Sequence, residues 1–227
     1  MITPPANSFT WAGERNCKEL ILALAPPYLV GRDVRRIMDF ACGTCEEIAT
    51  LAPHAQEYHF LDSHFLPAER PRYHLHRQPA SHRINLPDDY LDVVTSNGSF
   101  DHFRQADRIA AFLEIERVLK PGGVFLFACE YFDYDTPDFF ARTQADADMV
   151  ARNCAAYDNI DLHEICARLT RLRIVQDDKS MLPRGQPLSQ LVTTAATRIH
   201  TQPSACGLWV TWGAFFVAFA KVDSSLS

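Results

Sequence analysis

The chain has 227 residues, of which 47% are hydrophobic and 22% charged, and this composition is that of a globular protein with a full core. Its formal charge is −6, which argues against the concentrated positive patch that a dedicated DNA or RNA binder needs. The longest apolar runs fall short of the roughly 20 residues of a membrane-spanning helix, so we expect neither nucleic acid nor a membrane as partner.

The N-terminal residues and the cysteines indicate a cellular compartment. The segment Met1–Pro5 carries neither the basic nor the apolar region of a signal peptide. Seven cysteines, an odd number, occur without a secretory signal, and free thiols are therefore expected rather than a disulfide framework. The sequence predicts a cytoplasmic protein.

In the first half of the chain, residues 1–34 read as a polar arm followed by a helix that Pro26 and Pro27 end. Short apolar runs then predict strands, and a segment with acids in its first turn predicts a helix, because the helix dipole favours negative charge there. The strands are expected at 35–41, 58–62 and 73–78, and the helix at 46–52.

The second half contains the strongest strand signals and one well-defined helix. Residues 108–119 have apolar side chains at helical spacing, and the turn 120–123, with Pro and Gly, is expected to end that helix. Apolar residues from Leu188 to Ile199 also follow a helical period, and Gly213 would allow a β-bulge. Strands are expected at 91–96, 124–129, 172–175 and 209–222, and a further helix at 162–169.

Strands that alternate with helices through short connections predict a doubly wound, mainly parallel α/β sheet. The sequence contains no internal repeat, low-complexity tract or clear linker. We therefore expect one domain over residues 1–227, with insertions at 130–170 and 177–207.

The turn after the first strand is the most informative feature. Ligands of such sheets bind at the carboxyl ends of the strands, and Gly43 lets the backbone approach a ligand closely there. Asp62 follows 19 residues after Gly43, at the end of the next strand, where a carboxylate can accept both hydroxyl hydrogens of a ribose. These residues favour a cofactor that contains a nucleoside.

Several segments carry a family resemblance. Residues 39–45 (Asp-Phe-Ala-Cys-Gly-Thr-Cys) resemble motif I, Asp-x-Gly-x-Gly-x-Gly, of the class I S-adenosylmethionine-dependent methyltransferases. Residues 60–62, 86–94, 96–103 and, most specifically, 116–123 resemble later landmarks of the same family in order and spacing. The resemblance implies a Rossmann-like sheet of seven strands with an antiparallel C-terminal strand. It also implies an N-terminal arm and helix at 1–34, a cofactor-binding half at 35–129 and a substrate-side half at 130–227.

The resemblance further implies S-adenosylmethionine as cofactor and S-adenosylhomocysteine as product. The backbone of 41–45 would line the methionine part, Asp62 would hold the ribose, and Ser63 would neighbour the adenine. His82 and Arg83 stand where the family often has an acid that binds the adenine amino group. The cofactor-binding residues implied are Asp39, Ala41, Cys42, Gly43, Cys45, Asp62, Ser63, His82, Arg83, Asn97 and Gly98.

Two positions depart from motif I. Ala41 replaces the first glycine, which is a mild change if the φ angle of Ala41 is negative. Cys45 replaces the last glycine and adds a side chain where the backbone packs closely.

Three residues are candidates for catalysis. His102 follows the fourth strand, and a neutral imidazole there can take a proton from a hydroxyl or an amine. Glu130 and Tyr131 follow the fifth strand at the same edge and are candidates for binding substrate. The acidic charge favours a small molecule as acceptor, and the predicted function is methyl transfer to an oxygen or nitrogen of such a molecule by a monomer or homodimer.

Two alternatives stay open. A protein of this fold could use the pocket without methylating, as a cyclase-type enzyme or an inactive binding partner. The Cys-x-x-Cys pair Cys42 and Cys45 stands where a helix N-terminus lowers a thiol pKa, which suits a redox protein. No metal site is expected, because no second Cys-x-x-Cys and no His-x3-His is present and the histidines between 54 and 82 are expected on the surface or on strand faces.

Overall fold

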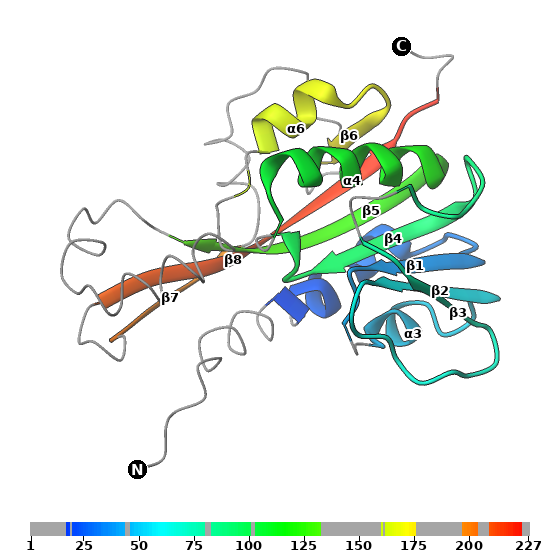
Figure 1. The fold of residues 1–227 in the computed structure, drawn as a ribbon, viewed down its shortest axis with the longest axis horizontal. Coiled ribbons are helices and arrows are strands. Elements are labelled where there is room, and N and C mark those ends of the chain that lie inside the picture. Colours follow the sequence, from blue (N-terminus) through cyan, green and yellow to red (C-terminus); the bar gives the residue numbers. More distant parts are fainter. Residues whose placement is uncertain are drawn as a thin grey trace.

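The computed structural model describes residues 17–18, 20–43, 46–79, 83–100, 103–132, 160, 162–175, 197–203 and 209–223. Its centre is an eight-stranded sheet in the order β3-β2-β1-β4-β5-β8-β6, with β7 paired to β8 (Figure 1). The strands are β1 Arg36–Phe40, β2 Glu57–Asp62, β3 Tyr73–Arg77, β4 Leu91–Asn97, β5 Leu119–Phe132, β6 Leu172–Val175, β7 Thr197–Pro203 and β8 Trp209–Lys221.

The direction of the strands confirms the expected fold class. From β3 to β5 all neighbours are parallel, whereas β8 runs antiparallel to both β5 and β6. The order reverses at β1, where β2 leads to one side and β4 to the other. Such a switch point is where parallel sheets bind ligands.

Helices cover both faces of the sheet. Helices α4 (Gln105–Val118) and α6 (Leu162–Arg168) lie on one face, whereas α3 (Glu47–Leu51) and the helical residues from 20 to α2 (Pro26–Leu29) pack on the other (Figure 1). Within the described ranges, no helix is long and apolar enough to cross a membrane.

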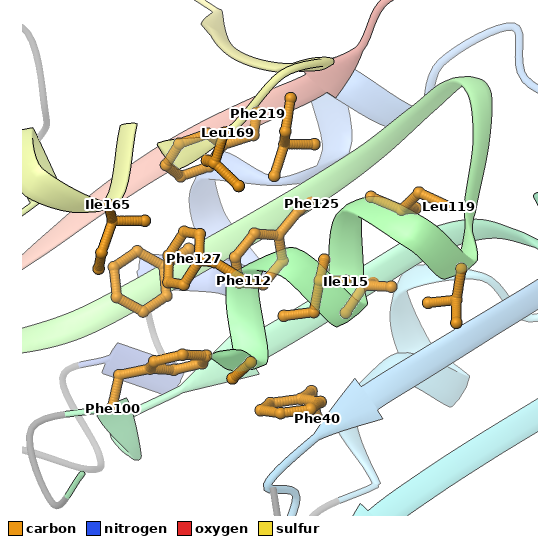
Figure 2. Packing of buried hydrophobic residues seen from close by; sticks show 14 of the residues in the cluster. Phe40, Phe100, Phe112, Ile115, Leu119, Phe125, Phe127, Ile165, Leu169 and Phe219 are labelled. Carbon is orange, nitrogen blue, oxygen red and sulfur yellow. The ribbon is translucent and has the colours of Figure 1, made fainter. Parts of the chain in front are cut away.

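Aromatic rings dominate the core under α4. Phe112 of α4 meets Phe125, Phe127 and Phe219 edge-on, with ring centroids 5.2, 5.6 and 5.5 Å apart, and all four side chains are fully buried (Figure 2). Edge-on contacts of this kind are a preferred aromatic geometry. This packing fixes α4 against β5 and β8.

The structure corrects several boundaries. The helical residues before Pro26 end at Leu24, as expected, but a second short helix, α2, begins at Pro26, because its missing N–H and fixed φ suit the first helical turn. Helix α4 begins at Gln105, earlier than the expected residue 108, and β5 starts at Leu119. The turn expected at 120–123 is an irregularity inside β5, where its register with β4 shifts and Gly122 has a φ of 76°. The bulge expected at Gly213 is absent from the described β5–β8 and β7–β8 pairings, which are continuous in register there.

The helical period expected from Leu188 to Ile199 does not hold at its end, and residues 188–196 lie outside the described ranges. Ile199 lies in β7, an additional strand beside the seven of the expected path. β8 extends past the last residue that β6 pairs, so its backbone groups would otherwise lack partners along that stretch, and β7 supplies them.

Candidate active site

The turn after β1 takes an unusual backbone course at the carboxyl edge of the sheet. Ala41 has a φ of 56° and Gly43 a φ of 55°. Between them Cys42 is buried, and its N–H donates to the carbonyl of Leu61, 3.1 Å away. The left-handed conformation costs a residue with a Cβ about 1–2 kcal/mol, so the alanine at position 41 is strained, and the negative φ that would have made the change mild is not found.

Asp62 ties the turn after β1 to the turn after β2. Its Oδ2 accepts the N–H of Gly43 at 3.0 Å, and its Oδ1 accepts the N–H groups of His64 and Phe65 at 2.8 and 3.0 Å. A carboxylate has about four acceptor positions, so one on Oδ2 remains for a further donor. Ser63, between the strand end and His64, is exposed beside this carboxylate.

The backbone at Gly43 borders open space. A Cβ added to Gly43 would meet no atom of the described chain within 4 Å. Among the described residues, the edge therefore offers a glycine that a ligand can approach, next to a carboxylate with one acceptor position that none of them uses.

The turn after β4 closes the other side of the site. The hydroxyl of Ser99 donates to the carbonyl of Ala41 at 2.8 Å, and Gly98, with a φ of 60°, donates its N–H to Ala128 at 3.0 Å. Asn97 is buried directly before them. The structure thus brings Ala41, Gly43, Asp62, Asn97 and Gly98 together at the carboxyl edge of three adjacent strands.

Asp39 lies beneath this edge and is almost completely buried. Its Oδ1 accepts the hydroxyl of Thr95 at 2.9 Å, whereas its Oδ2 has no hydrogen-bond partner among the described residues. Burial raises the pKa of Asp39 to about 8, against the opposing effect of the Thr95 hydroxyl. A cationic or hydrogen-donating group bound here would satisfy the unpaired oxygen.

Charged residues that the sequence analysis did not single out surround Asp39. Lys18, from the N-terminal helical segment, pairs with Glu47 at the start of α3, and both act on the pKa of Asp39, Lys18 lowering it and Glu47 raising it. No motif marks Lys18, because its position depends on how the N-terminal segment packs. Thr95 and Ser99 could have been suspected from the sequence. Thr95 lies in β4 and Ser99 follows it, and β4 is the neighbour of the motif I strand β1 in the sheet.

Other predicted site residues lie elsewhere or outside the described ranges. The carbonyl of Arg83 accepts the side-chain N–H of Gln78 at 3.0 Å. A hydrogen bond from Arg117 lowers the pKa of Asp88, and, against the opposing effect of burial, Arg117 also lowers that of Glu114, with a smaller contribution from the charge of Arg83 to both. The backbone of β5 at Glu130 and Tyr131 pairs with β8, but their side chains are outside the description, as are the residues Thr44, Cys45, His82 and His102.

Comparisons with known proteins identify this architecture. Residues 38–127 match the family model of a methyltransferase domain. Residues 38–127 therefore carry a methyltransferase domain. The methyl donor of this class of enzyme is S-adenosylmethionine. Among curated proteins, none matches the sequence significantly.

Solved structures share the fold of the methyltransferase domain. The YcgJ protein from Bacillus subtilis is 18% identical with a TM-score of 0.57, over 89% of this chain and 98% of that protein. A putative methyltransferase from Bacillus halodurans is 15% identical, with a TM-score of 0.57, over 92% and 100%. Phosphoethanolamine N-methyltransferase 2 from Haemonchus contortus, in complex with phosphomonomethylethanolamine and S-adenosylhomocysteine, is 14% identical with a TM-score of 0.56, over 96% and 57%.

The residues of the methyltransferase domain suit its cofactor. The open space at Gly43 admits a ligand against the backbone, and Oδ2 of Asp62 can accept a hydroxyl hydrogen. The unpaired Oδ2 of Asp39 suits a positively charged group, and S-adenosylmethionine carries an ammonium and a sulfonium.

Proposed function

We propose that this protein transfers the methyl group of S-adenosylmethionine to an oxygen or nitrogen of a small-molecule acceptor. The observation that carries the proposal is the hydrogen bond from Gly43 to Asp62, which holds two strand-end turns together beside open space. Two loops fixed to each other make a pre-organised site, and pre-organisation lowers the cost of ordering a bound cofactor.

Each part of the edge has a proposed role toward the cofactor, whose sulfonium supplies an electrophilic methyl group. Oδ2 of Asp62 accepts a ribose hydroxyl hydrogen, with Ser63 beside the adenine. The backbone of Ala41 to Gly43 and that of Asn97 and Gly98 line the methionine part. Asp39 stabilises positive charge from below, because its unpaired Oδ2 faces no other donor among the described residues.

The acceptor is proposed to bind on the side shaped by residues 130–227. His102 follows β4 and would take the acceptor's proton, while Glu130 and Tyr131, late in β5, would position it. Methyl transfer needs alignment and exclusion of water more than a strong base. The net charge of −6 supports a small acceptor over nucleic acid, and the Haemonchus contortus enzyme with a small phosphorylated amine in its site offers a parallel. We further propose that the protein is cytoplasmic and acts as a monomer or homodimer.

One observation supports a second candidate. Ala41 adopts a left-handed conformation where motif I has glycine, and strained positions of this kind cluster at active sites and ligand-binding sites, so the binding site is kept although its motif is altered. A protein that binds the cofactor without transferring its methyl group, either a cyclase-type enzyme or an inactive partner, would also fit. Binding of S-adenosylmethionine without methyl transfer to any acceptor in a broad screen would favour this candidate.

The experiment that tests the proposed site is titration calorimetry with S-adenosylmethionine and S-adenosylhomocysteine on the full chain. Asp62→Ala removes the acceptor of the ribose hydroxyl and the link to Gly43. Hydrogen bonds to charged groups contribute about 1.5–3 kcal/mol, so we expect the affinity to fall by roughly 10- to 100-fold.

The matched control is Asp33→Ala, which removes an exposed carboxylate paired only to the exposed Arg35 in the described structure. We expect its affinity to equal that of the unaltered protein. If the folded wild-type chain binds neither ligand, the proposed function is wrong. If Asp62→Ala binds as tightly as the control, the placement of the cofactor is wrong.

A further inference from the structure

Four side chains with metal-binding chemistry lie on one face of the two outermost parallel strands. Glu57 and His59 alternate along β2, and His74 and His76 alternate along β3. The register pairs His59 with His74, and alternate residues of a strand point to the same face. β3 is the edge strand of the sheet, as Figure 1 shows. Pairing of the two strands therefore gathers side chains that are 15 or more residues apart in the sequence.

The ligand atoms of three of these residues are already close together. A carboxylate oxygen of Glu57 and one ring nitrogen each of His59 and His74 all lie within 4.8 Å of one another. The separation between Oε2 of Glu57 and Nε2 of His59 is 3.2 Å. Two ligands of a tetrahedral zinc ion, each about 2.0–2.2 Å from it, stand about 3.3–3.5 Å apart, which matches this pair.

We propose that Glu57, His59 and His74 bind a divalent transition-metal ion of the Zn²⁺ class. Two imidazoles and one carboxylate form a recognised three-ligand set that leaves a position for water. His59 is buried, whereas His74 is exposed. The half-buried Glu57 and the buried His59 thus form the fixed half of the site, and the exposed His74 side chain completes it around the ion.

Neighbouring groups orient the ligands as an outer shell does. The hydroxyl of Tyr90 donates to Oε2 of Glu57 at 2.6 Å, and the guanidinium of Arg36 donates to Oε1 at 3.2 Å. Nδ1 of His59 lies 3.0 Å from Nε2 of His76. With its proton on Nδ1 and donated to His76, the His59 ring presents the lone pair of Nε2 to the ion. His76 and Tyr90 are therefore positioning residues and not ligands.

One ligand of the proposed site, His74, is exposed, so an ion can reach the site from solvent.

The proposed metal stands apart from the cofactor edge. Glu57 begins β2 and Asp62 ends it, so about 16 Å of strand separates them at roughly 3.3 Å per residue. We therefore assign the ion a structural role, in which it joins the edge strand β3 to β2. The test consequently reads metal binding and stability and does not depend on methyl transfer.

The experiment uses tag-free, chelator-treated full-length protein titrated with Zn²⁺ by calorimetry and with Co²⁺ by visible absorption. We expect one equivalent to bind, the ligand-field bands of a four- or five-coordinate Co²⁺ site, and a higher melting temperature with Zn²⁺. His74→Ala should weaken Zn²⁺ binding at least tenfold without loss of fold, because the side chain is exposed. His76→Ala should weaken it less, as expected for an outer-shell residue.

The control is His54→Ala, which removes an exposed histidine just before β2 and outside the cluster, and it should bind Zn²⁺ as the wild type does. Circular dichroism establishes that each variant is folded. The proposal is overturned if the folded wild-type protein shows no saturable binding of either ion. It is equally overturned if His74→Ala and His54→Ala bind Zn²⁺ with the same affinity.

Discussion

Two carboxyl groups on neighbouring strands of the same sheet experience opposite environments. Asp39 in β1 is buried and receives one hydroxyl hydrogen bond, from Thr95, and its pKa is raised to about 8. Glu57 in β2 is half-buried and receives hydrogen bonds from Tyr90 and Arg36, and its pKa is lowered to about 2. The two groups belong to the two proposed sites, Asp39 to the cofactor edge and Glu57 to the histidine cluster.

The comparison shows how hydrogen-bond donors set the protonation state of each carboxyl group. Burial without enough donors leaves Asp39 with an unpaired oxygen and favours its neutral form, so the region is destabilised until a partner arrives. The donors around Glu57 keep it ionised with no ligand present. The number of hydrogen-bond donors therefore distinguishes the two groups. Asp39 has too few donors and can bind a cation, whereas Glu57 is already held in position by its donors.

The largest expected effect comes from Asp39→Asn. An acid whose pKa is raised in the folded state loses stability as the pH rises from its unfolded value toward its folded value, here from 3.8 to about 8. Each pKa unit corresponds to about 1.4 kcal/mol, so wild-type stability should fall by several kcal/mol relative to the variant across this range. Guanidinium unfolding at a series of pH values measures the difference.

The control for this prediction is Asp33→Asn, which changes an exposed carboxyl and should follow the wild-type curve. Curves for Asp39→Asn and the wild type that run parallel from about pH 4 to pH 8 would show that Asp39 is ionised in the folded protein at all these pH values. The contrast between the two carboxyl groups would then be lost.

An intermediate effect is expected from Tyr90→Phe at the other carboxyl group. The hydroxyl of Tyr90 makes the 2.6 Å bond that is the main cause of the low Glu57 pKa. Its loss should cost about 1.5–3 kcal/mol of unfolding free energy at about pH 7 in chelator-treated protein. An acid with a lowered pKa contributes stability above its unfolded value, 4.5, that is lost as the pH falls toward about 2. The cost of the substitution should therefore shrink at acid pH.

Tyr73→Phe is the matched control, because the Tyr73 hydroxyl donates to Glu46 over a longer distance, 3.1 Å, on a partly exposed side chain. Its cost should be smaller and should vary less with pH. Equal costs for the two tyrosines at both pH values would mean that Glu57 is not held more firmly than an ordinary surface carboxylate.

The cofactor edge could be predicted from the sequence only where one strand and its following turn decide the outcome, and the environment of Glu57 could not. Gly43 and Asp62 were expected at the same edge, and their hydrogen bond places them there. The left-handed φ of Ala41 could not be predicted, since alanine usually avoids that conformation and only the course of the turn imposes it.

Features that depend on pairing between segments were also missed. The histidine cluster requires the register of β2 on β3, which places His59 beside His74, although the alternation Glu-x-His and His-x-His on two adjacent strands was a signal that could have been used. Lys18 reaches the site by the packing of a distant helical segment, and β7 forms because the long β8 has unpaired backbone groups beside it. These outcomes depend on tertiary contacts that local patterns do not contain.

The smallest expected effect is that of Ala41→Gly, which tests whether the cofactor edge stores strain in its backbone as well as in its buried acid. Glycine adopts the φ of 56° without the cost of about 1–2 kcal/mol that a Cβ incurs, but it loses more entropy on folding, by about 0.5–1 kcal/mol. The net result should be a stabilisation of about 0.5–1 kcal/mol, measured by guanidinium unfolding. Ala110→Gly in the interior of α4 should destabilise by a similar amount, because its backbone is helical and gains nothing from glycine. Destabilisation by both substitutions would mean that the turn at Ala41 is not strained, and that the difference between the two regions lies in their carboxyl groups alone.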